Sequence, residues 1–203
     1  MVGRAGRALI AGVVVWTAAS CVAPERASLP TYDPAAYSGP APVPSPSPAP
    51  GLAEGNEYSI IVRKRERSLT LYLKGEQVKV WPVVLGMAPF GPKLYQGDLR
   101  TPEGLYFISG KRPHEKWSRF MLLSYPGPLD RDRYRTALAD GLVPVIDGLP
   151  PGVGGDVGIH GTDRFDANVR GVDWTLGCVS MFNEHVSELY DIVPVGTPVM
   201  IQE

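Results

Sequence analysis

The chain has 203 residues, of which 44% are hydrophobic and 20% charged, a composition that fits one globular domain with appendages and excludes a fibrous or wholly disordered protein. Its formal net charge is −1 and its pI is about 6.3, so it lacks the clustered basic surplus of nucleic-acid-binding proteins, and we expect no nucleic-acid partner. The prolines and glycines are unevenly distributed along the chain, and they distinguish segments of different composition.

The first twenty residues have the pattern of a secretory signal peptide. Arg4 and Arg7 precede an apolar segment, residues 8–19, that is too short to span a bilayer as a helix. Small residues then precede Cys21, as in the lipobox at which bacterial lipoproteins are cleaved and diacylated, although an alanine stands where that motif usually has leucine. We predict a signal peptide over residues 1–20 and lipidation of Cys21. Ordinary cleavage nearby and an uncleaved N-terminal anchor are the alternatives.

The next segment is rich in proline. Residues 22–56 hold nine of the 21 prolines, in runs such as GPAPVPSPSPAPG. Alternating proline and small residues favour extended polyproline II and cannot bury a core. We predict that residues 21–56 form a lipid-anchored linker that spans roughly 3 Å per residue; a solvated tail with no selected length fits equally well. A disulfide between Cys21 and Cys178 is chemically feasible in an oxidising compartment, but a tethered Cys21 is a poor partner.

Residues 57–203 are numerous enough to bury a sizeable core, and we predict that they form one domain. Alternating apolar residues predict a strand over 58–62 and a hairpin over 69–80 that turns at Lys74-Gly75. Further strands are expected over residues 81–85, 105–108, 120–124, 157–160 and 198–201. A short helix is expected over 130–140, and a loop rich in glycine and proline over 144–155.

The clearest helix follows Cys178. Asn183 is a residue type that often caps a helix N-terminus. Four apolar residues then fall at helical spacing and predict a core-facing stripe: Val186, Leu189, Tyr190 and Val193. Strands outnumber helices throughout the domain, so we predict a β-rich α+β fold with one or two short helices.

Cys178 and His160 have the clearest catalytic potential. A nucleophilic cysteine reacts as the thiolate, so it needs a nearby base or cation at neutral pH. His160 ends a predicted strand, and both residues lie where strands give way to loops, from which catalytic side chains often emerge. Gly177 would let a substrate approach closely, and backbone amides around Cys178 could form an oxyanion hole. Residue spacing alone also fits a buried structural cysteine.

The neighbours of Cys178 have both functional and structural interpretations. Thr175 could form hydrogen bonds within the cysteine loop or simply cap it. Asp173 could orient His160, although a role in capping a turn is favoured. Trp174 could line a cleft, but an aromatic residue beside such a loop more often packs.

The remaining polar candidates are assigned structural roles. Asp98 and Arg100 are expected to form an ion pair within a turn, and His114 and His185 are expected to be exposed. One histidine near one cysteine falls short of the three or four ligands of a zinc site. We therefore predict no metal site and no cofactor.

Several motifs resemble the L,D-transpeptidase (YkuD-like) catalytic domain. The first motif is residues 159–162 (IHGT), and the second is residues 175–181 (TLGCVSM). Fourteen residues, 161–174, separate His160 from the second motif. The family has a histidine, a spacer of similar length, and then Ser or Thr, any residue, Gly and Cys. The run GDLRTPEG at 97–104 and the closing GTPV at 196–199 are also similar. The resemblance therefore extends over most of residues 57–203.

The resemblance implies an L,D-transpeptidase-like β-sandwich or barrel and a cysteine acyl-enzyme. It implies that Cys178 attacks a carbonyl of a peptidoglycan tetrapeptide stem and that His160 serves as general base and then acid. Gly177 and Thr175 would complete the catalytic group, with backbone amides of Gly177 and Cys178 stabilising the oxyanion. The residues expected to contact substrate are Gly161, Trp174, Leu176 and Ser180.

Two positions depart from the family pattern. Leu176 stands where many members have histidine, and Ser180 stands where many have arginine or asparagine, so the arginine expected to pair with a substrate carboxylate is missing. The run DWTLGCVSM resembles the YafK-like branch, some of whose members cleave links to peptidoglycan rather than form them. We expect a transpeptidase that cross-links the wall or attaches protein to it; hydrolysis at the same site, or a silent wall-binding module, are the alternatives.

These interpretations also predict a location and partners. Peptidoglycan stem peptides are the expected partner, and the lipid on Cys21 would anchor the chain to a membrane. We expect a monomer in the cell envelope or periplasm, at the outer membrane if the cell is Gram-negative.

Overall fold

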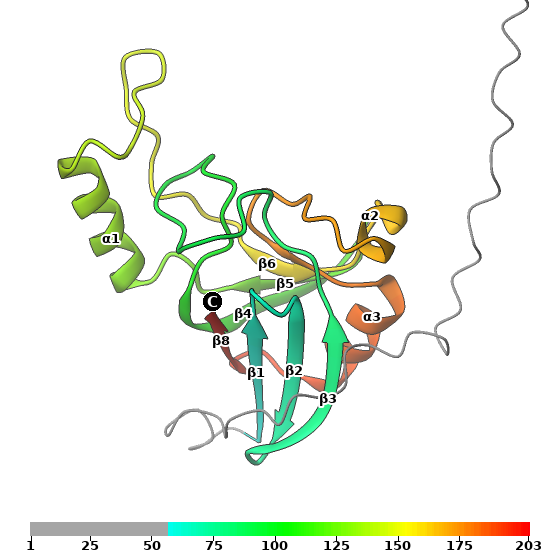
Figure 1. Cartoon of the computed structure of the whole chain (residues 1–203). Coiled ribbons are helices and arrows are strands. Elements are labelled where there is room, and N and C mark those ends of the chain that lie inside the picture. Colours follow the sequence, from blue (N-terminus) through cyan, green and yellow to red (C-terminus); the bar gives the residue numbers. More distant parts are fainter. Residues whose placement is uncertain (1–56) are drawn as a thin grey trace, which may run out of the picture. The chain divides into compact units, whose positions relative to one another are not determined.

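A computed structural model describes residues 57–203 (Figure 1). The predicted signal peptide, the lipidation site at Cys21 and the proline-rich linker lie outside the described residues. In chain order the elements are β1 (Tyr58–Arg63), β2 (Ser68–Leu73), β3 (Glu76–Pro82), β4 (Gly104–His114), β5 (Ser118–Leu123), α1 (Pro128–Ala139), β6 (Gly158–His160), α2 (Phe165–Val169), β7 (Val179–Ser180), α3 (Asn183–Ile192) and β8 (Pro198–Gln202).

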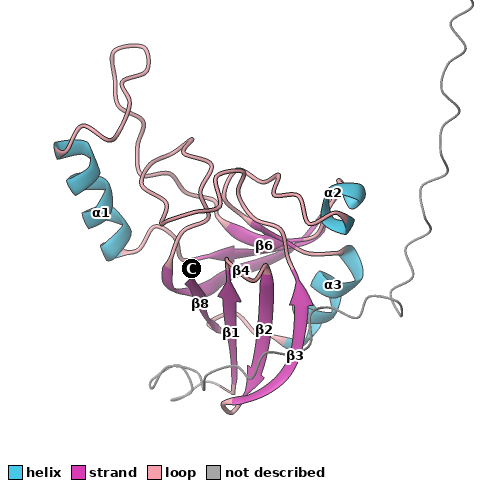
Figure 2. Ribbon diagram, viewed as in Figure 1, coloured by secondary structure: helices cyan, strands magenta, loops and turns pink. Residues whose placement is uncertain are grey.

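The strands form one mixed sheet in the order β3-β2-β1-β8-β4-β5-β6-β7. Most neighbours are antiparallel, whereas β1 pairs with β8, and β6 with β7, in parallel. The sheet is strongly curved, and the longest loops gather at one end of its strands (Figure 2). Helix α1 and the loop that follows it project to one side, while α2 and α3 lie on the other (Figure 1). The predicted β-rich α+β fold is confirmed, although the described chain has three helices rather than one or two.

One apolar core holds the sheet and α3 together. Ile60 on β1, Leu71 on β2 and Ile201 on β8 are almost completely buried, and so are Val186 and Leu189 of α3. Burying each such side chain stabilises the fold by about 1.5–3 kcal/mol relative to leaving it in water. The predicted apolar stripe of this helix is therefore confirmed as a core-facing surface.

A lysine from the sheet caps the C-terminus of α3. The helix has no basic residue in its last turn. Lys111 of β4 supplies the missing positive charge, since its ammonium donates to the carbonyl oxygens of Tyr190 and, at 2.7 Å, Val193. The partial negative charge at a helix C-terminus favours such a cation. Helix α3 is thereby fixed against the sheet.

Two predictions about the elements were wrong. Residues 83–85 do not continue the predicted strand, because β3 ends at Pro82. Val84 instead pairs with Ser180, and each backbone amide donates to the carbonyl oxygen of the other residue. Asn183 is not the N-cap of α3, which is Phe182. The Asn183 amide instead accepts from Thr162 N–H at 2.8 Å and donates to Thr162 O at 3.0 Å.

Candidate functional site

The register between β6 and β7 determines where the histidine and the cysteine emerge. Ile159 pairs with Val179 in the parallel ladder, and both are fully buried in the core. Side chains alternate along a strand, so His160 points to the face opposite Ile159, and Cys178 comes directly before β7. Both residues line one cleft, together with Lys93, Trp117, Trp174 and Leu176. The two sequence motifs are thus brought together by a two-residue strand pairing.

His160 is enclosed by aromatic rings. It is only 1% exposed, it stacks on Trp117 with ring centroids 4.2 Å apart, and Trp174 and Phe120 approach at 5.8 and 6.0 Å. Burial lowers the pKa of the imidazole to about 4, and this outweighs the opposing effect of its hydrogen bond to Gly161. The ring is therefore neutral at pH 7, as a general base must be.

A backbone carbonyl fixes the tautomer of His160. Nδ1 lies 2.6 Å from the carbonyl oxygen of Gly161, which can only accept, so Nδ1 carries the proton and Nε2 keeps a free lone pair. The hydroxyl of Ser180 donates to the same carbonyl at 3.1 Å. A chain of hydrogen bonds continues from Ser180 to Asn168 at 3.3 Å and on to the Trp174 indole at 2.9 Å. This network holds the imidazole in one orientation.

Gly161 and Ser180 lie behind His160 and not on the cleft surface, contrary to the expectation that they contact substrate. The Gly161 amide donates to Trp117 O at 3.0 Å, and a Cβ at this position would come within 2.2 Å of the Asn183 amide oxygen. Only glycine fits this contact. Both residues therefore support the histidine from within the protein.

Cys178 is a free thiol whose Sγ lies 3.7 Å from the carbonyl oxygen of Asp156. Burial raises the pKa of the thiol, while the Gly158 amide and the Lys93 ammonium oppose that rise. No hydrogen bond joins Sγ to the imidazole of His160 within residues 57–203. In this structure the pair is therefore a neutral thiol beside a neutral imidazole.

The turn before the cysteine is built on Gly177 and Thr175. Gly177 has φ +138°, and a Cβ there would lie 2.7 Å from Arg100 O, so the position requires glycine. Its amide donates to the Thr175 hydroxyl at 3.1 Å, and that hydroxyl donates to Cys178 O at 2.7 Å. Thr175 therefore forms hydrogen bonds within the loop. The Gly177 amide, which was expected to bind an oxyanion together with the Cys178 amide, is already engaged by Thr175.

Lys93 is a cation beside Gly177 in the cysteine loop, and sequence reasoning missed it. Its ammonium forms an ion pair with Asp98 at 2.6 Å, with each side chain only 4% exposed, and it would lie 3.7 Å from a Cβ on Gly177. Asp98 also accepts from the backbone amides of Leu94, Tyr95 and Arg100. A buried charge needs this degree of pairing.

The predicted ion pair between Asp98 and Arg100 was therefore wrong. Asp98 bonds the Arg100 amide but pairs its charge with Lys93, and the Arg100 guanidinium donates to Pro92 O at 3.4 Å. No signal in the sequence marks Lys93, which lies in an irregular segment between proline and leucine.

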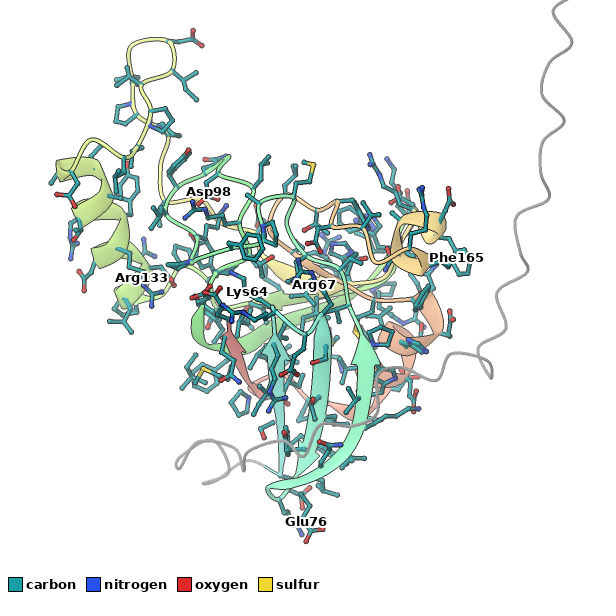
Figure 3. All side chains as sticks on the ribbon, in the orientation of Figure 1. Lys64, Arg67, Glu76, Asp98, Arg133 and Phe165 are labelled. Carbon is teal, nitrogen blue, oxygen red and sulfur yellow. The ribbon has the colours of Figure 1, made fainter. Side chains whose placement is uncertain are left out.

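Asp173 does not orient His160. Its carboxylate pairs with the Arg67 guanidinium at 2.6 Å and accepts from the Leu85 amide at 2.8 Å. Arg67 and Asp98 both lie among the loops at the same end of the sheet (Figure 3). Asp173 therefore ties the cysteine loop to the start of β2. Leu176, two residues before Cys178, is 71% exposed on the cleft rim.

The other two histidines are half-buried rather than exposed. His114 stacks on Trp117 at 4.3 Å in the cleft, and His185 packs edge-on against Phe182 at 5.4 Å. Residues 57–203 contain no group of three or more His, Cys, Asp or Glu side chains arranged to hold a metal ion. Across the same residues, none of the helices has the length and apolar character needed to cross a bilayer.

Comparisons with known proteins place this geometry in a family. Over 145 residues, 68% of this chain, it is 24% identical to the putative L,D-transpeptidase YafK of Escherichia coli K12. It spans about half, 48%, of that relative's length. Two solved structures share the fold with a TM-score of 0.51, each over 72% of this chain. They are Bd1075 of Bdellovibrio bacteriovorus, 20% identical with 48% of its chain covered, and the helical cell shape determining protein Pgp2 of Campylobacter jejuni, 21% identical with 47% covered. The model of the L,D-transpeptidase catalytic domain (YkuD) matches residues 57–201, and the chain therefore belongs to that family.

Proposed function

We propose that this protein is a peptidoglycan-modifying cysteine acyltransferase, an L,D-transpeptidase, with Cys178 as nucleophile and His160 as general base. One observation carries the proposal: both side chains line one cleft, and the carbonyl of Gly161 commits Nδ1 so that Nε2 is the basic atom. Membership of the L,D-transpeptidase family supports the substrate class. Peptidoglycan tetrapeptide stems would be the acyl donors.

The reaction divides into two acyl transfers. Nε2 of His160 takes the thiol proton while Sγ of Cys178 forms a bond to the donor carbonyl carbon, and the carbonyl oxygen becomes an oxyanion. The tetrahedral intermediate collapses when the C–N bond breaks, and the imidazolium returns the proton to the departing amine. An acceptor amine then attacks the thioester and loses its proton to Nε2. The C–S bond breaks to give the new amide, and the imidazolium returns that proton to the departing thiolate, which restores the thiol.

The protonation states favour a concerted first step. The pKa of Cys178 is raised and that of His160 lowered, so a preformed thiolate–imidazolium pair is disfavoured in the free protein. Proton transfer therefore accompanies attack on the substrate.

Lys93 would help to stabilise the developing negative charge. The Cys178 amide is one donor to the oxyanion, and the Gly177 amide is already bonded to Thr175. The ammonium of Lys93 lies beside this turn and lowers the thiol pKa against the effect of burial. A buried positive charge there would stabilise both the thiolate and the oxyanion.

Hydrolysis is the second candidate for the same site. Leu176 is exposed on the cleft rim, where many family members have histidine, and Ser180 is buried behind the base. Neither side chain offers a polar group to an incoming amine. Water would then replace the amine in the second step and release the stem peptide as a free acid.

The decisive experiment uses the full chain with purified disaccharide-tetrapeptides, with and without an amine acceptor, followed by mass spectrometry. A new amide product supports transfer, and a shortened stem without acceptor supports hydrolysis. Wild-type protein should also form a covalent adduct with a carbapenem, and Cys178→Ala should form none. Persistence of the adduct in Cys178→Ala would eliminate this cysteine as the nucleophile. If no donor gave any product, the silent wall-binding module would be the interpretation that remains.

We also propose that the chain acts in the cell envelope as a lipid-anchored monomer, with cleavage before Cys21 and the linker at 21–56. The support is the basic, apolar and small-residue pattern that precedes Cys21. Detergent phase partitioning of wild-type protein and Cys21→Ser tests this. Equal partitioning of the two would rule out lipidation at Cys21.

A further inference from the structure

Two arginines of the cleft lie over aromatic rings that themselves contact His160. The guanidinium carbon of Arg164 is 5.3 Å from the centre of the Trp174 ring, and that ring meets His160 edge-on at 5.8 Å. The guanidinium carbon of Arg112 is 5.0 Å from the centre of the Phe120 ring, which lies 6.0 Å from His160. One charged group is thus held on the side of the cysteine loop and one on the side of the β4–β5 hairpin.

The fold fixes both positions. Arg112, Phe120 and His160 are directly opposite one another across β4, β5 and β6, so they form a row along the sheet. The Arg164 amide donates to the Thr162 hydroxyl at 2.8 Å, and its carbonyl begins the hydrogen bonding of α2. The ring beneath Arg164 is held by its own bond to Asn168 at 2.9 Å. The two guanidiniums therefore start from defined places rather than from free loops.

Within residues 57–203, neither guanidinium has an acidic partner. No carboxylate between residues 57 and 203 lies within ion-pair distance of Arg112 or Arg164. Asp163, the neighbour of Arg164, accepts instead from the Trp117 indole at 3.1 Å. Both arginines line the same cleft as Cys178, and both are exposed there. Their donors are available to a ligand.

The chemistry of these positions fits carboxylates. A guanidinium presents paired N–H donors that match the two oxygens of a carboxylate, and its weak hydration lets it remain stacked on a ring while it does so. Ser180 is fully buried behind His160, where its hydroxyl donates to the Gly161 carbonyl, so it cannot reach a ligand. We propose that Arg164 and Arg112 bind carboxylate groups of the peptide ligand on the two sides of His160. The identity of that ligand as a stem peptide rests on the function proposed above.

The test pairs arginine variants with ligands that lack the charge. The equilibrium dissociation constant of a tetrapeptide stem is measured on the full chain carrying Cys178→Ala, which binds without turnover, and is compared with that of a stem whose carboxylates are amidated. Arg164→Gln and Arg112→Gln are each expected to weaken binding of the charged stem about ten- to one-hundred-fold, the value of a charged hydrogen bond. The amidated stem should bind weakly to every variant, with no further loss from either substitution. Arg164→Lys should recover only part of the affinity, because it keeps the charge but not the paired donors.

Lys116→Gln is the charge-matched control, because Lys116 is exposed in the same cleft but stacks on no aromatic ring of residues 57–203. It should weaken binding less than about threefold. An equal loss in Lys116→Gln would reduce the effect to general attraction and overturn the proposal, as would unchanged binding in both arginine variants. Absence of any stem binding by the parent protein would overturn both this proposal and the substrate class. Carboxylate-dependent binding without acyl transfer would retain the arginines and reject only the enzymatic function.

Discussion

The two sides of the Cys178 cleft differ in their buried ionisable groups: one holds an ion pair, and the other holds an uncharged imidazole. On one side Lys93 and Asp98 keep a full ion pair at 4% exposure, because three backbone amides and a 2.6 Å contact replace the lost water. On the other side His160 is surrounded by Trp117, Trp174 and Phe120 and is driven to the neutral form. The ion pair is thus supported by several hydrogen bonds, whereas burial among aromatic rings lowers the pKa of the imidazole.

The comparison has a catalytic consequence. A neutral imidazole with one committed nitrogen can accept a proton, and a fixed ammonium can stabilise the negative charge that appears on sulfur or oxygen. Cys178, Lys93 and His160 all line the same cleft. Substitutions on each side should therefore have separable effects.

The largest effect is expected on the histidine side. His160→Gln removes the proposed base and should slow acylation of Cys178 by about 10²- to 10⁴-fold. Stopped-flow measurement of adduct formation with a carbapenem gives the rate, and circular dichroism controls for folding. A rate within a few-fold of wild type would exclude His160 as the base.

On the opposite side, Lys93→Met should leave the Asp98 carboxylate buried without its cation. Removing one partner of a buried pair costs about 3–5 kcal/mol, and the three amides on Asp98 place the expected loss near 3 kcal/mol. Urea denaturation measures it, and the double variant Lys93→Met/Asp98→Asn should recover most of the loss. The thiol pKa, from the pH dependence of alkylation, should also rise in Lys93→Met. No change in either quantity would contradict the interpretation of this pair.

The neutral histidine makes stability depend on pH. The pKa of His160 is about 4 in the folded protein and near 6.5 in an unfolded chain, so the unfolded state binds more protons between these values. Stability is full above pH 6.5 and should fall by roughly 2.5 kcal/mol by pH 4.5. Urea midpoints at several pH values measure the loss. Burial also lowers the pKa of His185, so the comparison with His160→Gln, which should lack only the His160 contribution, isolates the effect.

The smallest effect is expected at the cleft rim. Leu176→His introduces the residue that many family members have, at a site that is 71% exposed. It should change the free energy of unfolding by no more than about 0.5 kcal/mol. The ratio of amine transfer to hydrolysis is the informative measurement, and it should shift toward transfer. An unchanged ratio would show that Leu176 does not determine the choice of acceptor.

Local patterns determined much of this protein. Apolar alternation in residues 58–62 and 69–80 predicted β1 and the β2–β3 hairpin, and the spacing of Val186, Leu189 and Val193 predicted the buried face of α3. The motifs around His160 and Cys178 predicted the family. These features depend on residues that are close in sequence, where periodicity and motif spacing are visible.

Only the tertiary structure decided the surroundings of the cysteine. Lys93 reaches the loop from 85 positions away, Asp173 binds Arg67 instead of His160, and the Gly177 amide is taken by Thr175. The short β7 and α2 have too few residues for a recognisable period. Sequence thus determined which residues could react, whereas long-range packing decided their protonation states, because desolvation and pairing depend on atoms that no local pattern brings together.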